Sequence, residues 1–301
     1  MGAAFFVSKK SDGLKGDWYM MKVVHMIDHY RKLCQDSWKL GNFEAYRIYT
    51  QTYSQLFDAI FQYLYTASID SLRGLIEWSN FEQILKTVER NYSQGICDHV
   101  IAVAQKSAER MKFDFEYELF LGMELSNIGG CSVPRKSQIP YLYIGIDREL
   151  TKEMIDILVP HEMVHMIHQQ RTEQYEEETL FMRVVEEGLA SFAPMWLYHM
   201  EWNPENLSRI LGITKTDVQI LIENMEKIQA MVMRDGEKLL TEEMMRKYFM
   251  FSDNSSELRL PGYYIGLCLT EQSVRAGASF DDLLSMPSQD IIRFWNSQGL
   301  L

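Results

Sequence analysis

Cysteine is scarce in this sequence, and its few cysteines form no pattern. The 301 residues contain four, with no CxxC pair among them: Cys34, Cys97, Cys131 and Cys268. Disulfide frameworks belong mainly to short secreted chains, and a cysteine zinc site needs closely spaced pairs. We therefore predict reduced thiols and a cytoplasmic protein.

Excess positive charge and long apolar runs are also lacking. Lys and Arg number 30 against 42 Asp and Glu, which gives a formal net charge of −12. Non-specific nucleic-acid binding requires a basic face, so this balance argues against it. No apolar stretch approaches the roughly 18 residues of a membrane span, and the N-terminal run AAFFV is too short for a signal-peptide core. We expect neither nucleic acid nor membrane as a partner, and the oligomeric state stays open.

Proline is missing between Asp17 and Met111, where the pattern is helical. Glycine occurs there only at three places, which we interpret as helix ends: Gly41, Gly74 and Gly95. The aromatic-rich stretch 42–68 suits packing between helices better than a cofactor site. The sequence thus predicts a stack of long helices over the first third of the chain.

Strand patterns follow directly after this helical stretch. Residues 113–121, FDFEYELFL, alternate apolar with mostly acidic side chains, and 141–147, YLYIGID, has a second strand composition. Between them, 126–140 is rich in Gly, Ser and Pro and is predicted to be a loop. Helical pattern then returns at Thr151. We predict a predominantly helical α+β protein, with an N-terminal helical region at 1–110 and a catalytic region at 111–301 packed as one globule.

The most informative motif is HEMVH at 161–165. His161 and His165 are four residues apart, so on a helix they share a face and can reach one metal ion. Glu162 lies about 100° around the helix, where it can hold a metal-bound water and take its proton. An HExxH arises by chance in about one percent of sequences of this composition, so the context must decide.

A catalytic zinc normally takes a third protein ligand. The metzincin pattern fails, because the required Gly and His positions hold His168 and Arg171. A later helix at 180–196, LFMRVVEEGLASFAPMW, offers Glu186 and Glu187 instead. We favour Glu187 and interpret Glu186 as a solvated carboxylate.

Small residues support that choice. Glu187 shares a helical face with Ala190 and Ser191, which would allow this helix to approach the HEMVH helix closely. Ser191 is a candidate partner for a ligand histidine, although a hydrogen bond to its own helix backbone is the stronger alternative. His168 fits a hydrogen-bonded neighbour of the site better than a ligand.

HExxH followed about twenty residues later by E-G-x-A resembles the gluzincin zinc peptidases, including the aminopeptidase and leukotriene-hydrolase group. Their third ligand is the Glu of a similar segment, here Glu187. That group also carries a tyrosine in a Y-x-x-G segment that stabilises the tetrahedral intermediate, matched here by Tyr263 and Gly266. By periodicity, Tyr263 shares a stripe with Gly266, whereas Tyr264 aligns with Glu271 and Arg275, which should face water. The alternative is that both tyrosines are core residues. The resemblance implies a thermolysin-like or gluzincin-like catalytic core that holds Zn2+.

The order of motifs over roughly 113–295 also resembles a bacterial family of predicted zinc-dependent proteases of unknown function. One segment departs from the aminopeptidase pattern: GMELSN at 122–127 only faintly matches the sequence that anchors a substrate amine. We therefore carry over no exopeptidase activity and assign Glu124 no role.

Two structural expectations accompany the motif. Pro160 directly precedes it, so we predict a kink or break near Val159–Pro160, with Thr151 capping the earlier segment and Leu150 and Ile155 packing together. The strand at 141–147 either binds an extended substrate by adding it to the sheet or makes no substrate contact.

The function that fits these residues best is a zinc-dependent peptidase, a hydrolase that cleaves peptide or protein substrates. Glu162 would activate water and Tyr263 would stabilise the oxyanion, with His161, His165 and Glu187 as metal ligands. Two alternatives stay open: a zinc hydrolase for a non-peptide ester or amide, and a non-catalytic metal-binding helical protein. The sequence does not separate endopeptidase from exopeptidase.

Overall fold

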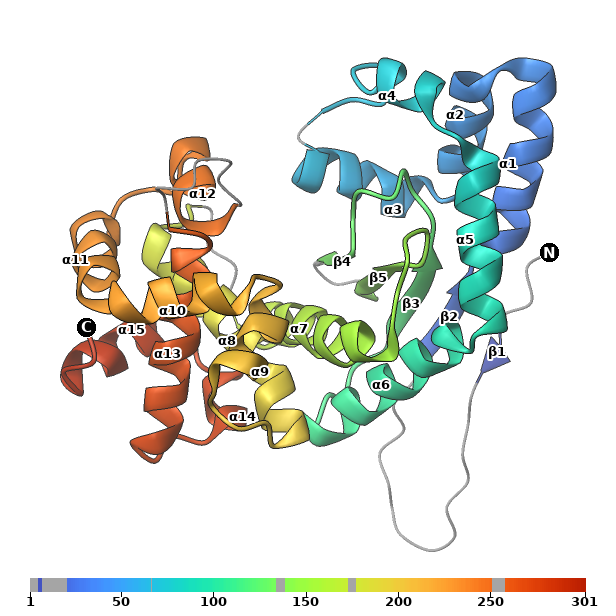
Figure 1. The fold of residues 1–301 in the computed structure, drawn as a ribbon. Helices are drawn as coiled ribbons and strands as arrows, with labels where there is room; N and C mark the ends of the chain where they lie inside the picture. The colour runs from blue at the N-terminus through green and yellow to red at the C-terminus, as the bar shows by residue number, and fades with distance from the viewer. Residues whose placement is uncertain (1–4, 7–20, 66, 134–138, 173–176, 251–257) are drawn as a thin grey trace, which may run out of the picture. The chain divides into compact units, whose positions relative to one another are not determined.

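The computed structural model describes the chain except for residues 1–4, 7–20, 66, 134–138, 173–176 and 251–257. Most of the run AAFFV lies outside these described residues. The chain divides inside helix α7 (Lys152–Arg171) into two compact units, Met1–Glu162 and Met163–Leu301. The first unit runs from blue to green in Figure 1 and the second from green to red.

One small sheet forms the centre of the first unit (Figure 1). Its strand order is β1-β2-β3-β5-β4. The bounds are β1 Phe5–Phe6, β2 Met21–His25, β3 Tyr117–Gly122, β4 Gly130–Val133 and β5 Tyr141–Gly145. Strands β2, β3 and β5 are parallel, whereas β1 and β4 are antiparallel to their neighbours. The prediction of a mainly helical α+β protein with a small sheet is confirmed.

Three strand predictions need correction. β3 begins at Tyr117 and not at residue 113, β4 lies inside the segment predicted to be a loop, and β2 lies in the stretch predicted to be wholly helical. Both missed strands are only four or five residues long, too short for their alternation to stand out. Since β2 pairs with β3, the regions expected at 1–110 and 111–301 share one sheet.

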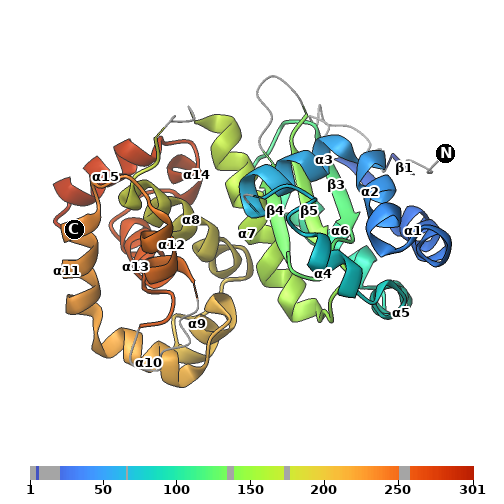
Figure 2. The same ribbon diagram turned by 90° about the horizontal axis from the view of Figure 1, so that it is seen from above.

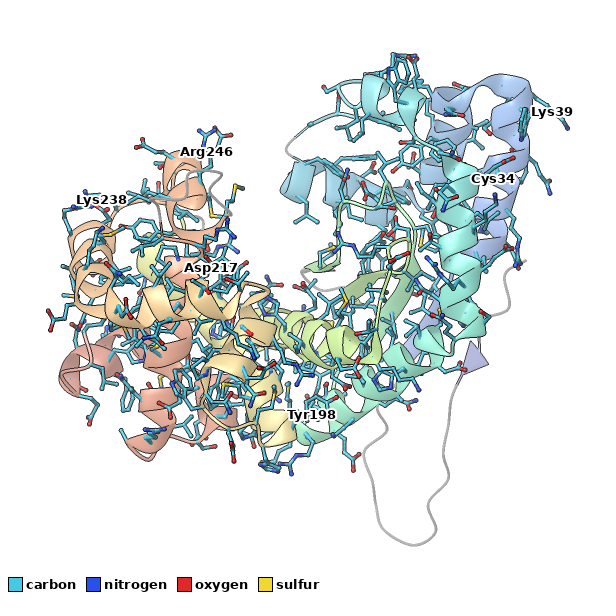
Figure 3. All side chains as sticks on the ribbon, viewed as in Figure 1. Cys34, Lys39, Tyr198, Asp217, Lys238 and Arg246 are labelled. Atoms are coloured by element: carbon cyan, nitrogen blue, oxygen red, sulfur yellow. The ribbon has the colours of Figure 1, made fainter. Side chains whose placement is uncertain are left out.

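Helices account for most of the first unit. They are α1 Ile27–Leu40, α2 Asn42–Thr52, α3 Ser54–Ala59, the π-helical η1 Ile60–Tyr65, α4 Arg73–Trp78, α5 Phe81–Ser93 and α6 Ile96–Arg110. Gly41 and Gly95 stand between helices with φ of 82° and 71°, as the sequence predicted, whereas Gly74 lies inside α4. All four cysteines are buried and free; Figure 3 shows Cys34 on α1 with Lys39 of the same helix pointing outward.

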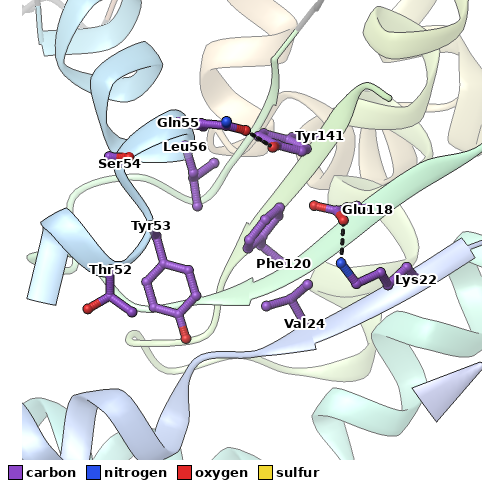
Figure 4. A pocket seen from close by; sticks show the side chains of 10 residues that line it. All are labelled: Lys22, Val24, Thr52, Tyr53, Ser54, Gln55, Leu56, Glu118, Phe120 and Tyr141. Atoms are coloured by element: carbon purple, nitrogen blue, oxygen red, sulfur yellow. Dashed lines mark hydrogen bonds and ion pairs between the residues drawn. The ribbon is translucent and has the colours of Figure 1, made fainter. Parts of the chain in front are cut away.

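The two faces of the sheet are covered by different helices (Figure 2). The α2–α3 turn covers the face that carries Phe120 and Tyr141, through a Tyr53–Phe120 ring contact and a Tyr141–Gln55 hydrogen bond of 2.8 Å. A hollow of about 360 Å3 remains there, beside the Lys22–Glu118 ion pair (Figure 4). Helix α7 contacts the opposite face, so this hollow does not belong to the HEMVH helix.

The second unit is entirely helical apart from one isolated bridge, as far as its residues are described. After the end of α7 it contains α8 Leu180–Tyr198, α9 Pro204–Leu211, α10 Lys215–Glu223, α11 Met225–Asp235, α12 Glu242–Phe249, α13 Pro261–Arg275, α14 Phe280–Leu283 and α15 Ser288–Ser297. Fully buried Trp295 donates to Ser273 at 2.8 Å, which ties α15 to α13. None of the described helices is long and apolar enough to cross a membrane.

Helices α8 and α13 approach each other most closely at two glycines. A Cβ added to Gly188 would overlap the backbone of Gly266, and one added to Gly266 would overlap the carbonyl oxygen of Val184. Only glycine allows two helix backbones to come this close. The contact lies directly beside Glu187, so it fixes the part of α8 that carries the predicted third ligand.

Candidate metal centre

Helix α7 carries the HEMVH motif and does not break at its proline. Thr151 caps it by accepting from the backbone N–H of Met154 at 3.3 Å, as predicted. Pro160 lies within the helix, so of the predicted kink or break, the break does not occur. An internal proline costs about 3 kcal/mol. Full burial of apolar side chains on both sides of it, such as Ile155 and Val164, offsets that cost.

The structure brings the three predicted metal ligands together. One ligand atom from each of His161, His165 and Glu187 lies within 4.8 Å of the others, so the group could hold a metal ion. The two histidines are half-buried and follow each other by one turn of α7, while Glu187 is buried on α8. Among the described residues, no other cluster of this kind occurs.

The spacing within the group suits a metal better than a direct hydrogen bond. Nε2 of His165 and Oε2 of Glu187 are 3.5 Å apart. Two ligand atoms at zinc bond lengths and tetrahedral angles would be about 3.4 Å apart. Two imidazoles and one carboxylate are also the donor set of a catalytic zinc site with one position left for water or substrate. These residues therefore fit a zinc ion, although the group alone does not identify the metal.

Glu162 follows the first ligand and lies against the sheet. Its side chain is 9% exposed. A Cβ at Gly130, the first residue of β4, would come within 2.8 Å of Cγ and 3.2 Å of Oε1 of Glu162. The glycine thus leaves the space that the carboxylate occupies. This places the predicted general base directly beside strand β4.

The strand expected to bind substrate is not at the edge of the sheet. β5, Tyr141–Gly145, pairs with β3 on one side and with β4 on the other. Its backbone groups are therefore already hydrogen-bonded, and it cannot accept an added strand. Of the two alternatives for 141–147, addition of a substrate strand is excluded for β5, and β4 is the edge strand.

A network of half-buried charged side chains surrounds the buried Glu187 on α8. Arg183, one turn earlier, donates to Oε1 of Glu187 at 3.4 Å and forms an ion pair with Glu178 at 2.8 Å. Arg183 was not among the residues predicted for the site, although an Arg four residues from a Glu on a helix is a recognisable pair. Glu186 is half-buried rather than solvated; burial raises its pKa, and the charges of Arg183 and His165 partly oppose this.

The two tyrosines at the start of α13 differ in environment. Tyr264 is 4% exposed, so the expectation that it faces water is wrong, although Arg275 on the same stripe is exposed as expected. Burial, followed by the nearby Cys268 thiol, raises its pKa. Tyr263 is half-buried, and its ring meets Phe249 edge-on with centroids 5.6 Å apart. It stands three residues before Gly266, on the face of α13 that packs against α8.

The remaining two candidates are both buried. Nε2 of His168 makes a hydrogen bond of 3.0 Å with the carbonyl oxygen of Met286. Burial lowers the pKa of His168 to about 4, so it is neutral and donates this bond. Ser191 is 2% exposed and lies four residues after Glu187. His168 thus ties α7 to the segment before α15 within the second unit.

Glu124, to which we assigned no role from the sequence, is fully buried beyond the end of β3. It accepts from the backbone N–H of Asn127 at 3.2 Å and from the hydroxyl of Tyr65. Asp147, beyond the end of β5, accepts from the N–H groups of Glu124 and Ser126 at 2.7 and 2.9 Å. The two carboxylates therefore hold the loop that leads into β4.

The Glu124 carboxyl should make stability depend on pH. Burial, with a smaller effect from the charge of Asp147, raises its pKa from 4.5 to about 7. Between pH 4.5 and about 7, the folded protein keeps a proton on Glu124 that the unfolded chain loses. The free energy of unfolding therefore falls as pH rises through this range, by up to about 3 kcal/mol. We expect the stability of Glu124→Gln not to fall in this way. Urea unfolding of the parent and the variant between pH 5 and 8 would measure both stabilities. If the two stabilities changed with pH in parallel, Glu124 would not be the group responsible.

No family model, curated protein or solved structure matches this chain. The residues of the site and their geometry therefore have to indicate its function.

Proposed function

We propose that this protein is a zinc-dependent peptidase of the gluzincin type. The observation that supports this best is the combination on α7 and α8: three ligand atoms at metal-binding distance, with Glu162 one residue after the first ligand. A structural zinc site is normally closed by four protein ligands, whereas three leave a position for catalysis. The proposal assigns His161, His165 and Glu187 to the metal.

The chain's own residues supply the remaining roles. Bound zinc would act as a Lewis acid toward the scissile carbonyl. Glu162 would accept a proton from the attacking water and return it to the leaving amine. The hydroxyl of Tyr263 would donate a hydrogen bond to the carbonyl oxygen as negative charge develops there.

The edge strand favours a peptide over a small ester or amide. β4 is the end strand of the sheet and begins beside Glu162. A row of backbone N–H and C=O groups at a sheet edge binds an extended chain by adding it as a strand. A small ester could not use that row of groups. The substrate we propose is therefore an extended peptide segment aligned along Gly130–Val133.

Metal content and peptide cleavage of the purified protein test the proposal together. We expect about one equivalent of zinc by elemental analysis and cleavage of a mixed peptide library detected by mass spectrometry. Removal of the metal with a chelator should abolish cleavage, and added Zn2+ or Co2+ should restore it. Stoichiometric zinc without cleavage of peptides would support a non-catalytic metal protein, and cleavage of ester substrates alone would support the other zinc hydrolase.

A further inference from the structure

Arg183 occupies an unusual position for a cation, because it contacts a residue that would itself bind a metal cation. Its Nη1 donates to Oε1 of Glu187 at 3.4 Å, while Oε2 of the same carboxylate lies 3.5 Å from Nε2 of His165. The two oxygens of Glu187 therefore face different partners. The side chain of Glu187 is only 8% exposed, so water competes little for either oxygen.

Glu178 fixes the guanidinium from its other side. Nη2 of Arg183 donates to Oε2 of Glu178 at 3.0 Å, and Nε lies 2.8 Å from Oε1 of the same carboxylate, which makes a close ion pair. Together with the hydrogen bond from Nη1 to Glu187, this contact holds the guanidinium between the two carboxylates. Since Arg183 and Glu178 are about 30% exposed, at 28% and 31%, this pair is also partly shielded from solvent.

The backbone around Glu178 is held in turn. Its carbonyl oxygen accepts from the N–H of Leu240 at 2.8 Å, and the N–H of Leu180 donates to the carbonyl oxygen of Lys238 at 3.1 Å. The backbone at the start of α8 is thus hydrogen-bonded to the segment between α11 and α12. A chain of contacts leads from this segment through Glu178 and Arg183 to Glu187.

The charges of the network also explain why Arg183 does not oppose a metal. An isolated guanidinium in contact with a metal ligand would repel a divalent cation bound there. Paired with Glu178, it is neutralised, and Glu187 keeps its own negative charge for the metal. The arrangement therefore orients the ligand without adding net positive charge to the site.

We propose that Arg183 is a positioning residue: it holds Oε1 of Glu187, so that Oε2 is the oxygen offered to the metal beside His165. Glu178 acts through Arg183 by fixing its guanidinium. This inference rests on the proposed metal centre. Partners that orient metal ligands typically contribute 10–100-fold to metal affinity.

Zinc affinity, measured by competition with a chromophoric chelator, tests the proposal. We expect Arg183→Gln to weaken zinc binding 10–100-fold. Arg183→Lys keeps the charge but loses the planar guanidinium, so its zinc affinity should lie between those of Arg183→Gln and the parent. Glu178→Gln should weaken binding less than Arg183→Gln. The double variant should be no weaker than Arg183→Gln alone, because Glu178 acts through Arg183.

Two further measurements separate positioning from general stability. The absorption spectrum of the Co2+-loaded protein should change in Arg183→Gln, since the carboxylate ligand can turn. Thermal unfolding of the metal-free proteins reports any loss of fold. Arg234→Gln is the control: it removes another Arg–carboxylate pair, with Asp235 at 2.9 Å, and should leave zinc affinity unchanged.

The outcomes distinguish this inference from the proposed function. If the parent protein binds no zinc, the metal centre itself is wrong. If the parent binds zinc and Arg183→Gln binds it within twofold, with an unchanged Co2+ spectrum, Arg183 does not position Glu187. A lower unfolding temperature with unchanged affinity would also overturn the inference. If Arg183→Gln does not fold, Arg183→Lys and Glu178→Gln provide the same comparison.

Discussion

Replacing Glu162 with glutamine is expected to lower kcat for peptide cleavage by roughly 10²–10⁴-fold, the usual contribution of a general base. Glutamine has nearly the same shape and fits the space beside Gly130, but it cannot accept a proton. Zinc content and thermal unfolding should therefore stay close to those of the parent. Steady-state kinetics on a cleaved library peptide, with elemental analysis of the same sample, would measure both.

Glu153→Gln provides the matched control for this substitution. Glu153 lies in the first turn of the same helix and is exposed, two turns before the metal ligands. Its removal changes net charge by the same amount without touching the site, so kcat should be unchanged. Cleavage by Glu162→Gln at the parental rate would contradict the assigned role, and loss of zinc in that variant would instead make Glu162 part of the ligand set.

The metal ligands could be predicted from the sequence because helix geometry determines them. Spacing of four residues brings His161 and His165 to one face. The close approach expected between α8 and the HEMVH helix at Ala190 and Ser191 is instead made between α8 and α13, at Gly188 and Gly266. The structure places His161, His165 and Glu187 at metal-binding distance. The same geometry predicts the cap at Thr151, since capping depends on a few neighbouring residues.

The sheet could be predicted only in part, because pairing depends on distant residues. β5 was recognised from its composition, but nothing local shows that β4, four residues with a glycine at its start, pairs outside it. Without β4, the strand at 141–147 is the last strand of the expected sheet and therefore its edge. Strand order is decided by tertiary contacts, so the substrate-binding edge could be assigned only once the register was known.

Pro160 and Tyr264 show how burial overrides local rules. A proline interior to a helix is unfavourable, yet α7 continues through it because its apolar face is fully buried on both sides. Tyr264 aligns with Glu271 and Arg275 on a helical wheel, yet it is buried. Nearly every residue in the first half of α13 is covered, so a stripe of polar residues late in the helix says little about its start.

Replacing Glu187 should have an effect on metal binding that its neighbour Glu186 does not share. Zinc sites bind with about 10–16 kcal/mol in total, so one of three protein ligands contributes roughly 4 kcal/mol, or about a thousandfold in affinity. We expect Glu187→Gln to weaken zinc binding by about that factor and to abolish cleavage at ordinary zinc concentrations. Chelator competition measures the affinity of each variant.

Glu186→Gln is the closest control that the chain offers, because it removes the same charge from the adjacent position on α8. The carboxylate of Glu186 is not part of the metal-binding group, whereas Oε2 of Glu187 lies 3.5 Å from His165. Loss of the Glu186 charge should therefore change zinc affinity only a few-fold, because that charge interacts with the ligand His165 without coordinating the metal. A reversal, with Glu186→Gln losing zinc and Glu187→Gln keeping it, would move the third ligand by one residue. Equal losses in both variants would instead show that net charge, rather than coordination, holds the metal.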